Sequence, residues 1–329
     1  MVTQQDVADR AGVSTTTVSH VINQTRFVSQ DLRQRVHRAM EELDYQPNVI
    51  ARSLRRQRTH NIAVIVPDIA YPFLAEVARG IEDEGFRMGY KAILCASQGD
   101  PDKESSCFDL VLTKQVDGVI LVGAGEDSRQ VQALFDRGAP IVVCNRELSI
   151  AEVDTVVADN EECGAQATNH LVSLGHRRIG CIAGPTKLSI GEERTRGYRR
   201  ALSDAGISFQ EELLARGDFR NRGGFDAMNR LLDLDQPPTG VFACNDLMAM
   251  GAICAASKRR LQIPEDVAII GCDDIALAAF TNPSLTTVRL PKYEMGSAAV
   301  EMLVARIEDR RGTVERRVLS VELVIRDSC

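Results

Sequence analysis

The 329-residue sequence lacks any apolar run approaching the roughly 20 residues needed to cross a bilayer, so we expect no membrane-spanning segment. Its opening, MVTQQDVADR, also lacks the apolar stretch of a secretory signal, and we expect a cytoplasmic protein. Nine cysteines are present without a C-x-x-C pair, so their spacing signals neither a zinc site nor a redox motif. We expect reduced thiols packed as small hydrophobic residues.

The motifs of common enzyme classes are absent as well. No G-x-G-x-x-G follows an apolar strand, and no Walker G-x-x-x-x-G-K-[ST], H-E-x-x-H or G-x-S-x-G occurs. The histidines, at positions 20, 37, 60, 170 and 176, are not spaced for metal binding or for activating a nucleophile. We therefore expect a protein that is not an enzyme, with no catalytic residue, no cofactor and no metal site.

The net charge of −7 is unfavourable for binding nucleic acid, but it is unevenly distributed. The first 60 residues hold nine Arg, no Lys and six acidic residues, a balance of +3. The remainder holds 30 Lys and Arg against 40 Asp and Glu, a balance of −10. From Tyr45 to His60 there are four Arg and no acid. Positive charge is therefore concentrated in a short N-terminal segment.

Three short helical patterns occupy this segment. Thr3 and Asp6 have the spacing of a capping box at the start of the first helix, and Gly12 ends it. Ser14 is placed to cap a second helix and Ser29 a third. Each pattern has apolar residues three and four positions apart, which predicts one buried face. Two short helices joined by a tight glycine turn and supported by a third are typical of a helix-turn-helix.

The second of these helices carries the candidate DNA-reading residues. A helix fits the major groove, where each base pair shows a distinct pattern of donors and acceptors. Thr15, Thr16 and His20 lie on the polar side of this helix, with Arg26 just beyond it. We expect these residues to contact DNA. A generic three-helix bundle with a polar face is the alternative that the spacing leaves open.

From residue 61 the pattern changes to short apolar runs that alternate with amphipathic helices. The expected strands are 62–68, 91–97, 118–123, 140–146, 178–184, 240–246 and 267–273. Near-continuous apolar strands separated by helices predict parallel sheets with helices on both faces. About ten strands in two long α/β stretches predict two doubly wound lobes, which bind ligands beyond the carboxyl ends of their strands.

Polar and aromatic residues gather after these strands. Together they suit a polyhydroxylated ring, because planar polar groups meet hydroxyl pairs and aromatic faces stack on ring C–H groups. For any single residue, an ordinary cap at the end of a strand is the alternative. The candidates for effector binding are Tyr71, Phe73, Asn145, Arg146, Arg194, Phe219, Asn245 and Asp273.

Several strings resemble a known family. DVADRAGVSTTTVSHVINQTRFVS and AMEELDYQPNVIARSLRR closely resemble the headpiece of the lactose-repressor (LacI/GalR) family, and most of all the ribose and purine repressors. HLVSLGHRRIGCIAG, FACNDLMAMG and IIGCDDIALA resemble the family's core and the ribose-type periplasmic sugar-binding proteins. The resemblance implies an all-α headpiece at 1–46, a hinge helix and linker at 47–60, and an effector-binding and dimerisation core of two α/β lobes at 61–329.

The resemblance also implies how the parts act. A hinge helix would order on DNA and insert Leu54 into the minor groove, with Arg55 beside it. Two chains would form a homodimer on a pseudo-palindromic double-stranded DNA operator. A small-molecule effector between the lobes would control operator affinity, which makes the protein an allosteric transcriptional regulator, with a repressor as the expected type. The end VELVIRDSC has no apolar heptads, so we expect no coiled-coil tetramer.

The effector is expected to be a sugar, but not necessarily ribose. Tyr71 stands where ribose-type sites have Asn, and Asn145 stands where they have Asp, which changes the hydroxyl partners. A purine or nucleoside stacked between Tyr71 and Phe219 is the second candidate. A secreted sugar-binding receptor is a different class, and the missing signal and the headpiece argue against it.

Overall fold

The computed structural model has two compact units, Met1–Thr59 and His60–Cys329. They are the headpiece and the core, and we describe each by itself. The structure describes residues 2–23, 26–45, 58–98, 100–113, 115–123, 128–147, 153–186, 188–308 and 312–329. Within these ranges, no helix has both the length and the apolar composition to cross a membrane.

The headpiece is built from α1 (Gln4–Ala11), α2 (Thr15–Asn23) and α3 (Gln30–Glu42). The predicted capping box is present, since Thr3 Oγ1 accepts from the Asp6 N–H at 3.3 Å and Asp6 Oδ2 accepts from the Thr3 N–H at 2.8 Å. The helices close around a small apolar core in which Val7, Val18 and Val36 are fully buried.

The two turns of the headpiece differ in how they are made. Gly12 ends α1 at φ 63°, a left-handed conformation that a residue without Cβ adopts at little cost. Ser29 is the N-cap residue of α3, as predicted, but its side chain makes no capping hydrogen bond. The predicted side-chain cap is therefore wrong. Val28, just before it, is buried in the headpiece core and anchors the start of α3 through packing.

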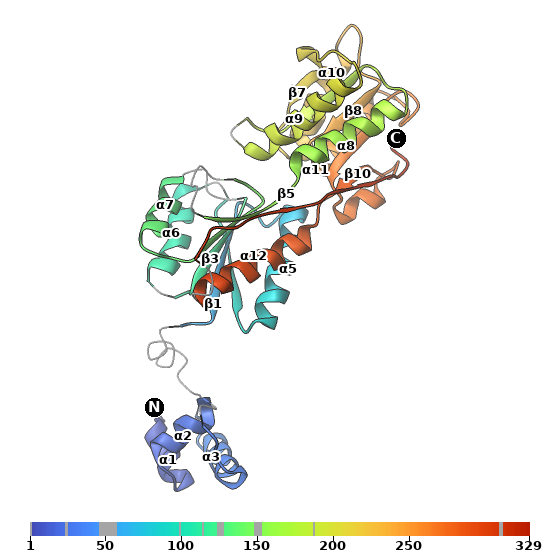
Figure 1. Ribbon diagram of the computed structural model, residues 1–329. Coiled ribbons are helices and arrows are strands. Elements are labelled where there is room, and N and C mark those ends of the chain that lie inside the picture. The colour runs from blue at the N-terminus through green and yellow to red at the C-terminus, as the bar shows by residue number, and fades with distance from the viewer. Residues whose placement is uncertain are drawn as a thin grey trace. The chain divides into compact units, whose positions relative to one another are not determined.

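The N-terminal lobe of the core contains a six-stranded parallel sheet in the order β11-β5-β4-β3-β1-β2. Its strands are β1 (Asn61–Val66), β2 (Lys91–Ala96), β3 (Gly118–Val122), β4 (Ile141–Cys144), β5 (Asp154–Ala158) and β11 (Arg316–Leu319). Alternate residues of β1 point to opposite faces. One face packs against α5 (Pro72–Arg87) and α12 (Lys292–Ile307), the other against α6 (Pro101–Leu112) and α7 (Ser128–Asp136) (Figure 1).

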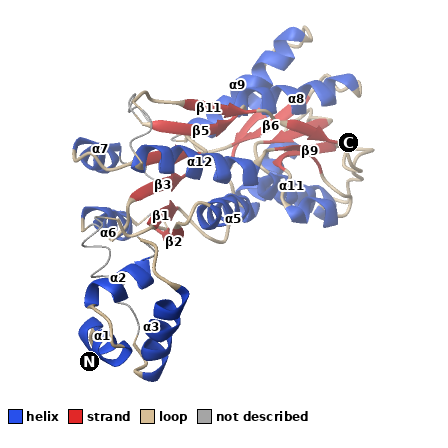
Figure 2. Cartoon of the chain, turned by 60° about the horizontal axis from the view of Figure 1, so that its bottom comes forward, coloured by secondary structure: helices blue, strands red, loops and turns tan. Residues whose placement is uncertain are grey.

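The C-terminal lobe has a second six-stranded sheet in the order β12-β10-β9-β8-β6-β7. Figure 2 labels two of its strands, β6 and β9. Only β12 is antiparallel to its neighbour. The strands are β6 (Ile179–Ala183), β7 (Leu214–Arg216), β8 (Gly240–Ala243), β9 (Ala268–Asp273), β10 (Thr286–Arg289) and β12 (Glu322–Val324). The helices are α8 (Asn160–Ser173), α9 (Ser189–Asp204), α10 (Asn221–Leu232) and α11 (Asp246–Lys258), with short 3-10 turns η1 (Glu211–Leu213) and η2 (Ala276–Phe280).

The chain passes between the lobes after β5, after β10 and after β11. The predicted two-lobed α/β fold is therefore confirmed, and each of the seven predicted strands is present. Five strands were not among them: β5, β7, β10, β11 and β12. Their sequences, DTVVA, LAR, TTVR, RRVL and ELV, mix polar or charged residues with apolar ones, so they lack the continuous apolar run that marks the seven predicted strands.

Glycines let α8 and α9 approach each other at backbone distance. A Cβ atom on Gly164 would lie 2.0 Å from the carbonyl oxygen of Arg194, and one on Gly197 would lie 1.9 Å from that of Glu161. Real Cβ atoms do not come this close to another backbone, so both positions require glycine. This contact fixes where α9 places Arg194.

We predict that Gly164→Ala lowers the free energy of unfolding by about 2–3 kcal/mol, because the added methyl group forces two helix backbones apart. Urea unfolding of the full chain measures the loss. Gly312→Ala is the matched control, since a Cβ there meets no atom within 4 Å. Equal stability of the Gly164 variant and the control would contradict the close packing.

Candidate functional site

The second headpiece helix is held by local contacts that leave one side open. Ser14 Oγ accepts from the Thr17 N–H at 3.1 Å and so caps the helix, as predicted. Val18 and Val21 are buried in the headpiece core and fix which side of α2 faces inward. The opposite side is available to a partner.

The predicted DNA-reading residues lie on and just after this helix. Thr16 is exposed, and Thr15 and His20 are partly buried. Arg26, beyond the end of α2, is exposed. The structure thus brings three short or planar hydrogen-bonding side chains onto one helix of a size that fits the major groove.

Two headpiece arginines join α1 and α3. Arg35 Nη2 donates to the carbonyl oxygens of Ala11 at 2.7 Å and Gly12 at 3.1 Å, at the end of α1. Arg10 Nε donates to Glu42 Oε2 at 2.6 Å. These contacts tie α3 to α1 and hold the helix-turn-helix together.

Leu54 and Arg55, the predicted minor-groove residues, lie outside the described residues. The same is true of the expected hinge helix at 48–56. Their proposed contact with DNA stays a prediction.

Arg194 is the centre of the polar cluster in the C-terminal lobe. It lies within α9 and is 2% exposed. Its Nε donates to Asn160 Oδ1 at 3.0 Å, and its Nη1 donates to the carbonyl oxygen of Cys244 and lies 3.2 Å from Asp273 Oδ1. One guanidinium therefore joins the first turn of α8 to the carboxyl ends of β8 and β9.

Asn245 fills the role of a structural cap. Its Oδ1 accepts from the Met248 N–H at 2.9 Å, and its Nδ2 donates to the carbonyl oxygen of Phe219 at 2.9 Å. These contacts are those of an ordinary cap at the end of a strand, which is the alternative that the sequence left open for each candidate residue. Its part in effector binding stays a prediction.

The backbone is strained at the strand ends. Asn145, Phe219 and Asp273 have φ values of 63°, 63° and 122°, and Asp274 has 53°. Residues with a Cβ rarely adopt such angles, although Asn and Asp do so more readily than others, and strained residues of this kind cluster at functional sites. The Phe219 ring packs on Gly184, where a Cβ would lie 2.2 Å from Phe219 Cζ.

The N-terminal lobe contributes an open acceptor. Asn145 is 7% exposed, and its Oδ1 has no hydrogen-bond partner among the described residues. An unsatisfied buried acceptor costs about 1–3 kcal/mol, which a hydroxyl or N–H group of a ligand would offset. Tyr71 and Arg146 are partly buried, while Phe73 is buried in the hydrophobic core.

Burial shifts the protonation of two carboxyl groups. It raises the pKa of Asp273 to about 6, although the positive charges of Arg194 and Lys292 oppose the shift. The pKa of Asp246 is also raised well above its usual range, by complete burial and by the charge of Asp273. Asp246 Oδ2 accepts from the Ile275 N–H at 2.8 Å.

Sequence reasoning missed Asn160, Lys292 and Arg220. Lys292 is 5% exposed, and its Nζ donates to the carbonyl oxygens of Asp273 at 2.6 Å and Asp274 at 2.8 Å. Asn160 follows β5, so the strand-end rule would have found it had that short strand been predicted. No pattern in the sequence points to Lys292 or Arg220.

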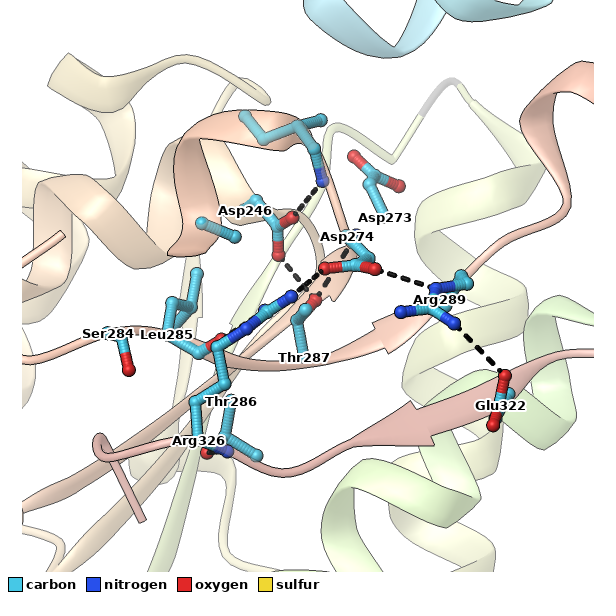
Figure 3. Close-up of polar contacts among 12 residues, drawn as sticks. Asp246, Asp273, Asp274, Ser284, Leu285, Thr286, Thr287, Arg289, Glu322 and Arg326 are labelled. Carbon is cyan, nitrogen blue, oxygen red and sulfur yellow. Dashed lines mark hydrogen bonds and ion pairs between the residues drawn. The ribbon is translucent and has the colours of Figure 1, made fainter. Parts of the chain in front are cut away.

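The side chains of the consecutive residues Asp273 and Asp274 have different partners. Asp274 accepts from Arg289 Nε at 2.7 Å and from Arg326 Nη2 at 2.6 Å, and Arg289 reaches Glu322 at 3.3 Å (Figure 3). A polar pocket of about 530 Å³ opens beside this network. None of the eight predicted effector residues is among the described residues that line it.

We predict that Asp273→Asn flattens the pH dependence of the unfolding free energy between about pH 4 and pH 6. The carboxyl keeps its proton up to about 6 when folded but loses it near 3.8 when unfolded, so stability falls as the pH rises through this window. Urea unfolding across this range measures the slope.

Asp274→Asn is the control for this change. Burial raises the pKa of Asp274, but hydrogen bonds from Arg326 and Arg289 lower it more. The pKa of Asp274 is therefore below its ordinary value, whereas that of Asp273 is above it. An unchanged slope in the Asp273 variant would contradict the assignment.

Comparison with known proteins agrees with this organisation. Residues 3–48 match "Bacterial regulatory proteins, lacI family", and residues 168–329 match "Periplasmic binding protein-like domain". The HTH-type transcriptional repressor PurR of Aliivibrio fischeri (strain MJ11) is 39% identical over 334 residues, which cover 100% of this chain and 98% of that protein.

Two solved structures are similar over the whole chain. The lac repressor dimer bound to operator and the anti-inducer ONPF has a TM-score of 0.89 at 26% identity, covering 99% of this chain and 98% of that one. The transcriptional regulator CelR–cellobiose complex has a TM-score of 0.79 at 35% identity, covering 100% of both chains. The chain therefore belongs to the lacI family of bacterial regulatory proteins and is a DNA-binding transcriptional regulator.

Proposed function

We propose that the protein is a homodimeric repressor whose affinity for a pseudo-palindromic operator is set by a small molecule bound between the core lobes. The observation that carries the proposal is the buried Asn145 Oδ1, which has no partner among the described residues, at the end of a strand in a chain with a helix-turn-helix. The protein acts by binding, without turning over a substrate, and works in the cytoplasm, where its DNA lies.

A sugar is the effector that the polar groups favour. Arg194, Asp273 and Asn160 form a hydrogen-bonded cluster, and Asn145 offers a free acceptor, which suits adjacent hydroxyls. The cellobiose in the similar CelR complex supports this class. A purine or nucleoside is the second candidate, favoured by the partly buried rings of Tyr71 and Phe219.

A thermal-shift screen of the full chain against pentoses, hexoses, nucleosides and purines tests the effector. Binding of any one class raises the unfolding temperature through mass action. Stabilisation by none of the four classes would overturn the proposed effector.

A homodimer requires a contact surface between its subunits, and an apolar surface lies at the edge of the N-terminal lobe. β2 is the edge strand of its sheet, and both α5 and α6 contact it. These elements expose Phe86, Ile93, Leu94 and Leu112, of which Phe86 is 82% exposed. Exposed apolar clusters mark interaction surfaces, and an unpaired edge strand invites association. We place the dimer contact here.

For the headpiece, we predict that Thr16→Ala relaxes base preference at one position of each half-site and weakens binding by about 1–3 kcal/mol. Selection from a random duplex library gives the operator, and fluorescence anisotropy gives the affinities. Gln34→Ala, an exposed change on α3, is the control. Binding of wild type that does not weaken with salt would contradict DNA recognition by this headpiece.

For the dimer, we predict that Leu94→Glu shifts the protein to monomers, because a buried unpaired charge opposes association. Sedimentation velocity measures the change. Ile325→Glu, at a residue of the C-terminal lobe that is 64% exposed, is the control and leaves the dimer intact. A dimer of unchanged stability in the Leu94 variant would place the contact elsewhere.

A further inference from the structure

Arg220 connects the two lobes of the core. Its Nη2 lies 3.2 Å from Asp68 Oδ2, and its Cζ lies 5.3 Å from the centre of the Tyr71 ring. Asp68 and Tyr71 belong to the loop between β1 and α5 of the N-terminal lobe. Arg220 directly precedes α10 of the C-terminal lobe. One side chain therefore makes an ion pair and a cation–π contact across the two lobes.

Both sides of this contact are held in place by their own backbones. Asp68 Oδ1 accepts from the Ala70 N–H at 2.9 Å, which leaves Oδ2 for the guanidinium. Tyr71 is the N-cap residue of α5, and its N–H donates to the carbonyl oxygen of Asp68 at 3.4 Å. The Arg220 N–H donates to Asp218 Oδ1 at 2.8 Å. Because the partners are already ordered, the contact loses less entropy than a free surface pair.

The strength of the contact suits a regulatory role. The Arg220 side chain is 61% exposed and that of Asp68 is 20% exposed, so salt screens the pair only in part. An exposed ion pair and a cation–π contact each shift an equilibrium by about two- to fivefold. Their combined effect approaches the lower end of the roughly 5- to 150-fold range of allosteric couplings.

We propose that Arg220 is an interlobe latch that favours the closed orientation of the lobes through Asp68 and Tyr71. The latch sets how often the effector site is closed before any effector arrives. Its regulatory meaning rests on the proposed function, but the contact itself depends on neither DNA nor effector. Arg220 and Asp68 are not among the predicted effector-contacting residues, whereas Tyr71 is one of them.

Single-molecule FRET of the full-length dimer tests the latch. Fluorophores are attached through non-natural amino acids at Glu82 on α5 and Ser257 on α11, in one labelled protomer per dimer, because the native Cys254 is exposed. We expect Arg220→Asp and Asp68→Arg each to lower the ratio of closed to open molecules about fivefold. The doubly reversed protein recovers the part of the closed population that depends on the ion pair, but not the part that depends on the cation–π contact with Tyr71.

Three further measurements make the result specific. Asp68→Asn keeps an acceptor for the Ala70 N–H, so it removes the charge without disturbing the loop and should lower closure about twofold. Raising NaCl from about 50 to 500 mM should lower closure in wild type but not in Arg220→Asp. The matched control is reversal of Arg222 and Asp226, an ion pair of 2.9 Å within α10, which should leave closure unchanged.

The outcomes separate the latch from the proposed function. Unchanged FRET populations in folded Arg220→Asp protein would overturn the latch, as would equal effects of the α10 control. The FRET measurements are made without DNA. Failure to select an operator would therefore contradict the proposed repressor function but not the latch. A latch effect together with operator affinities that follow the closed population would support both.

Discussion

The buried guanidinium of Arg194 is the constraint on which the carboxyl ends of β8 and β9, the predicted effector side of the C-terminal lobe, depend. A charge that is 2% exposed must be compensated, and here Asn160, Asp273 and the carbonyl oxygen of Cys244 compensate it. Removing one partner of a buried pair costs about 3–5 kcal/mol, because the other charge stays buried. The ends of β8 and β9 and the start of α8 are therefore held in one arrangement, with Gly164 allowing α9 to come close enough.

Beside this fixed cluster, polar contacts extend toward a segment where the chain passes between the lobes. Asp273 faces Arg194, while its neighbour Asp274 binds Arg326 and also Arg289, which directly precedes the crossing after β10. Lys292 links the carbonyl oxygens of both aspartates to the start of α12 in the other lobe. Asp273, one of the predicted effector residues, is thus one residue away from Asp274 and its contact with Arg289. In the proposed function, this arrangement would carry a change at the effector site to the chain segment that joins the lobes.

Local patterns in the sequence predicted much of this structure. The capping box of Thr3 and Asp6, the turn at Gly12 and the seven strands with continuous apolar runs follow from spacing and propensity. The positions of Asp273 and Asn145 at the carboxyl ends of strands follow from the same runs. The latch could not be predicted, because Arg220 and Asp68 are 152 residues apart and meet only through the packing of two lobes. The left-handed φ angle of Phe219 leaves no trace in residue type either, whereas Asn145 is of a type that adopts this conformation more readily.

In the proposed function, effector binding and operator binding are coupled through the core. The most direct test measures the affinity of the full-length protein for its selected operator with and without a saturating ligand from the thermal-shift screen. We expect operator affinity to change by about 5- to 150-fold when the ligand is bound. Because coupling is reciprocal, ligand affinity should change by the same factor when operator is bound. A ligand that binds the core while operator affinity stays the same would contradict this coupling.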